Sequence, residues 1–251
     1  MFKPHRTLGQ NFLSDKTIAK KMVSALEITK DDVVIEIGPG KGVLTAFITE
    51  IPYKKFHAVE VDRRLYLELV EKYKDTDNLE IHCDDILQWL PKFSIEGTVK
   101  VIASVPYYIT SPIIHQLIKM KNRPTTAVLL IQKEVAEKIK STAPNSSYMS
   151  SFTQTFFNVD YLGKVSAKDF WPVPEVDGGI LKLSLKNIDI PSEFVRKYEG
   201  FLHRAYSNPR KMLNKVFKKD ELEKGKIEPT LRAQNLDAEE WFNFYKVLNE
   251  V

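Results

Sequence analysis

The tetrad Ser104-Val105-Pro106-Tyr107 combines groups that can hold a nucleobase and stack against it. It follows an apolar run, residues 99–103, whose pattern predicts a buried strand. Ligands of open α/β sheets bind at the carboxyl ends of the strands. Carbonyl groups without a strand partner and an exposed tyrosine at that edge suit a flipped base. The tetrad therefore indicates a base-binding site, and neighbouring motifs have to supply the rest of the chemistry.

A glycine-rich loop upstream is the second candidate. Gly38, Gly40 and Gly42 stand between a predicted strand, residues 33–37, and a predicted helix, residues 43–48. Such glycines let the backbone approach a ligand and direct N–H groups at a negative group. A dinucleotide fingerprint places its third glycine three residues after the second, whereas here it comes after two. The loop better matches Glu-x-Gly-x-Gly, the first motif of S-adenosylmethionine-dependent methyltransferases.

Acidic residues end the next two predicted strands. Glu60 closes residues 56–61, about 20 residues after the glycine loop, where a carboxylate can accept hydrogen bonds from both ribose hydroxyls. Asp84 and Asp85 follow residues 79–83, where a carboxylate can accept from an adenine amino group. Each acid alone is typical of a solvated loop residue, but acids in this order behind a glycine loop favour a nucleoside site.

The elements that position these residues alternate between strand and helix. Strands are predicted at residues 33–37, 56–61, 79–83, 99–103 and 127–131. Helices are predicted after each strand and before the first, with Ser14 as the N-cap of the first helix. This alternation predicts an α/β fold with a mostly parallel sheet and helices on both faces.

The pattern changes in the last third of the chain. Residues 152–159 and 180–185 are predicted as an antiparallel pair that closes the sheet. Beyond residue 187 only helical patterns follow, at residues 194–205, 211–217 and 241–248. We therefore expect one domain over residues 1–187 and a helical domain over residues 188–251.

Composition describes an ordinary globular protein. The chain has 251 residues, of which 43% are hydrophobic and 28% charged. We expect neither a membrane span nor a signal peptide, and hence a cytoplasmic location. The single cysteine, Cys83, excludes an internal disulfide, and the five histidines lack zinc-binding spacing, so we expect no metal.

Positive charge is concentrated in one window. Residues 196–226 contain ten basic and four acidic residues, a surplus of six against a formal net charge of +4 for the whole chain. Charge runs are usually solvated helix faces, so on its own the window favours that explanation over a polyanion-binding surface.

Four further motifs, together with the glycine loop, point to one protein family. The chain resembles the KsgA/RsmA family of ribosomal RNA small-subunit adenine N6,N6-dimethyltransferases from about Leu8 to Leu236. The motifs that carry the resemblance are Gly9-Gln10-Asn11-Phe12-Leu13, the glycine loop, Gln132-Lys133-Glu134-Val135, Phe170-x-Pro172-x-Pro174-x-Val176-Asp177 and Asn208-x-Arg210-Lys211. It implies a Rossmann-like seven-stranded methyltransferase domain with a small C-terminal all-helical domain, and a role in ribosome biogenesis.

The resemblance also implies roles for individual residues. It implies S-adenosyl-L-methionine contacts for Gln10, Asn11, Leu13, Gly38, Gly40, Glu60, Asp85 and Ser104. The adenine-binding and catalytic positions are Ser104, Val105, Pro106, Tyr107 and Phe170. Ser104 and the Val105 carbonyl accept from the amino group, Tyr107 stacks on the base, and Phe170 covers its other face.

The implied partners are the small ribosomal subunit and its rRNA. We expect a monomer, the simpler state for a protein that docks on a particle. We expect phosphate contacts within the basic window, at Arg204, Arg210, Lys211 and Lys215.

Departures from the family pattern leave alternatives open. Ser104 stands where the family usually carries asparagine, residues 148–152 replace its Tyr-Gly-Arg-Leu-Ser, Gly178 stands where serine is common, and Pro209 separates Asn208 from Arg210. One alternative is the related large-subunit adenine methyltransferase that confers macrolide resistance. Another is a non-catalytic RNA-binding or ribosome-assembly factor on the same fold.

Overall fold

The structure is a computed structural model that describes residues 10–94, 96–104, 106, 109–188, 190 and 192–249. Contacts divide the chain into two compact units: Met1–Ala136 with Asp160–Leu185, and Glu137–Val159 with Lys186–Val251. The second unit resumes at Lys186, beside the boundary predicted between residues 187 and 188. It also takes residues 137–159, which the sequence prediction places in the first domain.

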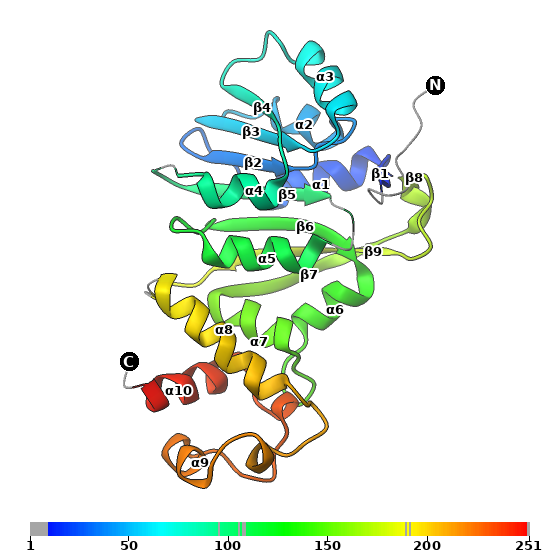
Figure 1. Cartoon of the computed structure of the whole chain (residues 1–251). Coiled ribbons are helices and arrows are strands. Elements are labelled where there is room, and N and C mark those ends of the chain that lie inside the picture. The colour runs from blue at the N-terminus through cyan, green and yellow to red at the C-terminus, as the bar shows by residue number, and fades with distance from the viewer. Residues whose placement is uncertain are drawn as a thin grey trace. The chain divides into compact units, whose positions relative to one another are not determined.

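A seven-stranded sheet organises the fold in the order β4-β3-β2-β5-β6-β9-β7 (Figure 1). The strands are β2 (Val33–Ile37), β3 (Lys55–Glu60), β4 (Leu79–Cys83), β5 (Val99–Ser104), β6 (Thr126–Gln132), β7 (Phe157–Val165) and β9 (Gly178–Leu185). The first five strands in this order, β4, β3, β2, β5 and β6, each pair in parallel with their neighbours, and β9 runs antiparallel to β6. The predicted mostly parallel, seven-stranded α/β sheet is confirmed.

A second, two-stranded sheet has no counterpart in the sequence prediction. Strand β1 (Phe12–Leu13) pairs antiparallel with β8 (Phe170–Trp171). The Phe12 and Trp171 rings stack with centroids 6.5 Å apart. This pairing fixes the segment that carries Gln10 and Asn11, at the start of the described chain.

The helices of the first unit follow the predicted alternation. They are α1 (Lys16–Leu26), α2 (Val43–Ile48), α3 (Arg63–Lys72), α4 (Ile86–Trp89) and α5 (Thr110–Lys119), while α6 (Lys133–Lys140) crosses the division between the units. The predicted N-cap of α1, Ser14, is wrong: the Asp15 carboxylate accepts from the N–H groups of Thr17 and Ile18. Ser14 instead donates its hydroxyl to the Asp169 carbonyl.

The hydrophobic core of the first unit lies on both faces of the sheet. Every residue of β2 is buried, as expected for a central parallel strand with helices on each side. Met22, Val23 and Leu26 of α1 pack against Val34 and Ile102 of the sheet. Helix α1 contacts α2, β5 and β6, whereas α4 contacts α5. This packing holds the carboxyl ends of β2 to β5 in register.

The second unit is helical and rich in aromatic residues. Its helices are α7 (Tyr148–Phe156), α8 (Ser192–Tyr206), α9 (Lys219–Gly225) and α10 (Ala238–Asn249). The Trp241 Nε1–H donates to the Tyr206 hydroxyl at 3.1 Å, and the hydroxyls of Tyr198 and Thr155 lie 2.9 Å apart. No helix in the described ranges combines the length and apolarity needed to cross a bilayer.

Two predicted elements differ in this region. Residues 152–156 form the end of α7 rather than a strand, and the strand runs from Phe157 to Val165. A capping box between Ser147 and Ser150 starts the helix and overrides the strand preference of the β-branched and aromatic residues that follow. Residues 211–217 form only a 3₁₀ turn, Leu213–Lys215, because the backbone at Met212 bridges to Arg232.

Candidate active site

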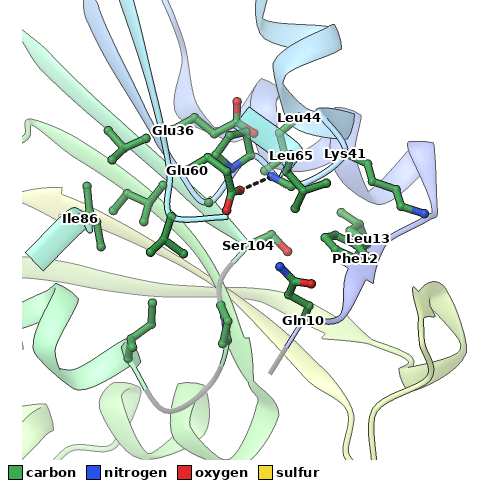
Figure 2. A pocket seen from close by; sticks show the side chains of 18 of the residues that line it. Gln10, Phe12, Leu13, Glu36, Lys41, Leu44, Glu60, Leu65, Ile86 and Ser104 are labelled. Carbon is green, nitrogen blue, oxygen red and sulfur yellow. Dashed lines mark hydrogen bonds between the residues drawn. The ribbon is translucent and has the colours of Figure 1, made fainter. Parts of the chain in front are cut away.

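A cavity of about 330 Å³ opens at the carboxyl ends of β2, β3, β4 and β5 (Figure 2). Ligand pockets commonly have about this volume or more. Its lining includes all eight residues for which the sequence predicts cofactor contacts: Gln10, Asn11, Leu13, Gly38, Gly40, Glu60, Asp85 and Ser104. The fold thus brings together residues from five separate segments. Their contact with a cofactor stays a prediction.

The glycine loop forms one wall and has a backbone that side chains rarely allow. Gly40 has φ +59°, in the left-handed region. A Cβ atom on Gly40 would lie 2.9 Å from the Phe12 ring, closer than carbon atoms approach without a shift. Glycine is therefore required here both by conformation and by the close approach of β1.

Glu60 ties this loop to the end of β3. Its Oε2 accepts from the Gly40 N–H at 2.9 Å and its Oε1 accepts from the Asp62 N–H at 2.9 Å. Only 4% of the residue is exposed, and burial raises the pKa of its carboxyl. Each carboxylate oxygen has a second lone pair, so the predicted ribose contact remains available while the carboxylate holds the loop.

Asp62 is a site-shaping residue that the sequence prediction missed. Its carboxylate accepts from the Gln10 carboxamide at 2.9 Å and pairs with the Arg64 guanidinium, whose hydrogen bonds lower the Asp62 pKa. Asp62 also caps α3 by accepting from the Arg64 N–H. It anchors the segment at Gln10 to β3. An acid two residues after a strand end and just before a helical pattern was the available signal.

Glu36 contributes a buried carboxyl to the cavity wall. The Thr45 hydroxyl donates to its Oε2 at 2.7 Å, while Oε1 has no partner among the described residues. The residue is fully buried, and burial raises its pKa to about 8. An orphaned polar atom in the wall of a cavity points to a ligand that carries a complementary polar group.

The fourth and fifth segments complete the cavity. Asp85 caps α4 by accepting from the Leu87 N–H at 2.9 Å. Ser104 is the last residue of β5, is half-buried, and lines the cavity together with Pro106. Figure 2 shows Ser104, Glu60 and Gln10 around the same space, although they are up to 94 positions apart in the sequence.

The remaining predicted base-binding residues divide into two groups. Val105 and Tyr107 lie outside the described residues. Phe170 is described, but only 4% of it is exposed and its ring packs in the core cluster with Leu13 and Ile180. It is absent from the described lining of the cavity. The structure therefore favours a packing role for Phe170 over the predicted cover of a base.

The predicted phosphate-binding residues also divide. Arg204 donates to both carboxylate oxygens of Glu221, at 2.8 and 2.7 Å, and its guanidinium carbon lies 4.4 Å from the centre of the Phe217 ring. These contacts give Arg204 a structural role within the helical unit. Arg210, Lys211 and Lys215 are exposed, as a phosphate contact requires.

Comparison with known proteins decides the family. A sequence profile described as ribosomal RNA adenine dimethylase matches residues 1–250. The chain belongs to this family. A relative from Persephonella marina, named ribosomal RNA small subunit methyltransferase A, is 32% identical over 97% of this chain and 93% of its own length.

Solved structures agree with the adenine dimethylase assignment. A dimethyladenosine transferase from Plasmodium falciparum superposes with a TM-score of 0.80 at 26% identity, covering 95% of this chain and 98% of that one. The 23S rRNA methyltransferase ErmE superposes at 0.75 over 95% of this chain and all of its own, but at 23% identity it supports the fold alone. The small-subunit name of the Persephonella marina relative favours the small-subunit prediction over the large-subunit alternative.

The cavity fits the cofactor of adenine dimethylases, S-adenosylmethionine. Its described lining carries Glu60, Asp84 and Asp85, together with Glu36, whose raised pKa favours the neutral acid, against one cationic side chain, Lys41. Carboxylates suit a ligand with a positive sulfonium, two hydroxyl donors and an amino group. At Gly38 and Gly40 the loop lines the cavity without a Cβ atom, and Oε1 of Glu36 has no partner among the described residues. The chain is an S-adenosylmethionine-dependent rRNA adenine dimethyltransferase.

Proposed function

We propose that this enzyme methylates N6 of two adjacent adenines near the 3′ end of small-subunit ribosomal RNA, twice on each base. The observation that carries the proposal is the cavity that joins the glycine loop and its acids to Ser104 at the end of β5. Family membership and the small-subunit name of the Persephonella marina relative support the choice of RNA.

One part of the cavity would hold the cofactor. Glu60 and Asp85 would accept hydrogen bonds from its ribose and adenine ends, and the loop at Gly38 and Gly40, which lines the same cavity, would lie against its methionine end. Gln10, held by Asp62, would close the space from the N-terminal side. Bound there, S-adenosylmethionine supplies an electrophilic methyl group.

The end of β5 would receive the target base. Adenine N6 is a poor nucleophile because its lone pair is delocalised into the ring. An acceptor such as the Ser104 Oγ can hydrogen-bond an amino hydrogen and aim the lone pair at the methyl group, so its contribution is positioning and electrostatics. By resemblance to the family, the Val105 carbonyl and the Tyr107 ring would supply the second acceptor and the stacking face.

Exposed cations would hold the RNA outside the base pocket. Arg210, Lys211 and Lys215 lie close together in the sequence of the helical unit, and their exposure suits phosphate contacts. We further propose that the enzyme docks as a monomer on the small ribosomal subunit in the cytoplasm.

Transfer of a labelled methyl group to purified particles tests the choice of substrate. Small and large subunits that lack the adenine methylation are incubated separately with the enzyme and labelled S-adenosylmethionine. We expect label in the RNA of the small subunit and background in that of the large one. Label confined to the large subunit would replace the proposal by the macrolide-resistance type of activity, and no label in either, despite cofactor binding, would favour a non-catalytic assembly factor.

A further inference from the structure

Two histidines and one glutamate meet on one face of the sheet, outside the cavity. His57 lies on β3, and Glu80 and His82 lie on β4, the strand that begins the order of the seven-stranded sheet. In the parallel register His57 stands opposite Glu80, with His82 two residues further along the same strand, so the three side chains share a face. One candidate ligand atom from each lies within 4.8 Å of the other two.

The distances within this cluster match the spacing of metal ligands. His57 Nδ1 and His82 Nε2 are 3.0 Å apart. Glu80 Oε2 lies 3.5 Å from His57 Nδ1 and 3.9 Å from His82 Nε2. Two ligands about 2.0–2.1 Å from a tetrahedral zinc ion lie roughly 3.3 Å from each other. Small side-chain adjustments would therefore place all three atoms around one ion.

The neighbours of the cluster hold its members in place. The Lys55 ammonium pairs with Glu80 Oε1, which leaves Oε2 facing the two imidazoles. Trp89 and Phe93 stack on each other at 4.5 Å and contact the histidine rings, with centroids 5.0 Å apart for Trp89 and His82 and 5.2 Å for Phe93 and His57. An apolar cover of this kind limits water access to a metal site.

A metal ion can take the place of the hydrogen bond between the His57 and His82 imidazoles. At 3.0 Å one nitrogen donates and the other accepts, so one lone pair already points into the cluster. Nε2 of His57 is buried and has no partner among the described residues, and the His57 ring meets Phe93 edge to face at 75°. A proton on Nε2 would leave Nδ1 bare. If the His82 proton then moves from its Nε2 to its own Nδ1, the His82 Nε2 also becomes free to bind a metal ion, and no proton is released overall.

We propose that His57 Nδ1, His82 Nε2 and Glu80 Oε2 bind a divalent transition-metal ion, with zinc as the reference ion and water in the fourth position. Imidazole and carboxylate ligands with one open position suit zinc. The ion would fasten β4 to β3 near Asp84 and Asp85, which follow the same strand and line the cavity. This metal site is independent of the proposed RNA substrate.

Local sequence motifs do not reveal this site because the ligands come from two strands. His57 and His82 are 25 residues apart, and the parallel pairing of β3 with β4 joins them. The expectation of no metal rests on local spacing motifs, which cannot detect two histidines that lie on different strands.

Calorimetric titration of the chelator-treated full chain with zinc chloride tests the proposal. We expect one zinc ion per chain and a higher thermal unfolding midpoint in its presence. Exposed or half-exposed ligands allow mild variants: His82→Gln and Glu80→Gln should each weaken binding by about tenfold or more, since even outer-shell changes cost about 10–100-fold. His203→Gln, which alters an exposed histidine of the helical unit, is the matched control and should bind as the native chain does.

A second control separates the cluster from the neighbouring thiol. Cys83 is exposed, so Cys83→Ser tests whether a thiolate captures the metal instead. We expect Cys83→Ser to bind as the native chain does. Absence of saturable one-to-one binding, equal binding by His82→Gln and His203→Gln, or a loss confined to Cys83→Ser would each overturn the proposal.

Discussion

Ser104 presents a single hydroxyl oxygen at the end of β5, where the family motif usually carries an asparagine amide. A hydroxyl accepts a hydrogen bond but reaches less far and lacks the fixed geometry of an amide. We expect Ser104→Asn to raise the methylation rate and Ser104→Ala to lower it. Because the acceptor acts on the base, cofactor affinity should change less than turnover. Single-turnover rates and cofactor titrations on the same variants measure both quantities.

The alanine variant is the decisive one of this pair. If Ser104→Ala were as active as the native enzyme, the acceptor role of the Ser104 hydroxyl would have to be abandoned. The main-chain carbonyl at Val105 would then be the remaining acceptor predicted by the family motif.

Glu36 makes stability depend on pH. Burial raises its pKa from 4.5 to about 8, so the folded chain binds this proton more tightly than the unfolded chain does. The stabilisation is complete below about pH 4.5 and is lost as pH rises toward and past 8. Glu36→Gln keeps an acceptor for the Thr45 hydroxyl and removes the titration. The unfolding free energy of Glu36→Gln should therefore fall less steeply with pH than that of the native chain. The two slopes should differ by on the order of 1 kcal/mol per pH unit.

Urea unfolding of the cofactor-free chain at several pH values between about 5 and 9 measures this difference. Glu239→Gln, at an exposed position in the first turn of α10, is the matched control for removal of a carboxyl. The control should follow the native pH profile. Parallel profiles for the native chain and Glu36→Gln would contradict the raised pKa.

At the scale of elements, the loop between β2 and α2 depends on backbone that only glycine adopts easily. Gly40→Ala would combine a positive φ with a Cβ 2.9 Å from the Phe12 ring. We expect a decrease of about 1–2 kcal/mol in unfolding free energy. Cofactor affinity should fall as well, because the same loop lines the cavity. Denaturant unfolding and calorimetric titration with S-adenosylmethionine measure the two effects.

Gly200 provides the matched control for the same substitution. It lies within α8, and a Cβ added there would meet no atom within 4 Å. Gly200→Ala should stabilise the chain by up to about 1 kcal/mol, because alanine has the higher helix propensity. The two variants should thus shift stability in opposite directions. A stabilising Gly40→Ala would refute the steric explanation of the loop.

Hydrophobic runs made the parallel strands predictable, whereas local signals failed where tertiary pairing decides. Strands β2, β3, β5 and β6 are largely buried, whereas β4 is half-buried to exposed, and the sequence places each of the five to within one or two residues. Strands β1 and β8 contain two residues each, too few to show a period, and form through their pairing. The 3₁₀ turn at residues 213–215 has helical spacing, but the bridge from Met212 to Arg232 limits it.

The cavity shows the same division between motifs and tertiary contacts. Motif residues such as Gly40, Glu60 and Ser104 meet in it because the carboxyl ends of parallel strands share one edge. The link from Gln10 to Asp62 joins residues 52 positions apart, so neither shows a partner in the sequence. Phe170 fits the family motif, yet burial in the core cluster gives its ring a packing place. Residue type predicted the chemistry, and long-range packing decided which side chains are free to perform it.

At the scale of the whole molecule, RNA binding should depend on salt through the exposed cations of the helical unit. The triple variant Arg210→Ala, Lys211→Ala and Lys215→Ala should weaken RNA binding. It should also reduce the slope of log affinity against log salt, by up to about 0.7–0.9 for each phosphate that the protein no longer neutralises. Binding to small-subunit RNA at several salt concentrations measures the slope.

A triple variant elsewhere controls for net charge. Lys54→Ala, Lys72→Ala and Lys74→Ala remove three exposed cations from the first unit. This variant should leave the salt slope closer to that of the native chain. Equal slopes for both triple variants would show that overall charge, rather than the predicted phosphate contacts, drives RNA binding.

The chemistry of the product tests the assigned activity most directly. Small subunits lacking the modification are treated with the enzyme and S-adenosylmethionine, and their RNA is digested to nucleosides for mass spectrometry. We predict N6,N6-dimethyladenosine, since the family is described as an adenine dimethylase, and the proposed function places it at two residues per particle when the reaction is complete. Absence of any methylated adenosine, under conditions where calorimetry shows the cofactor bound, would contradict the assignment of this cavity as an adenine methyltransferase site.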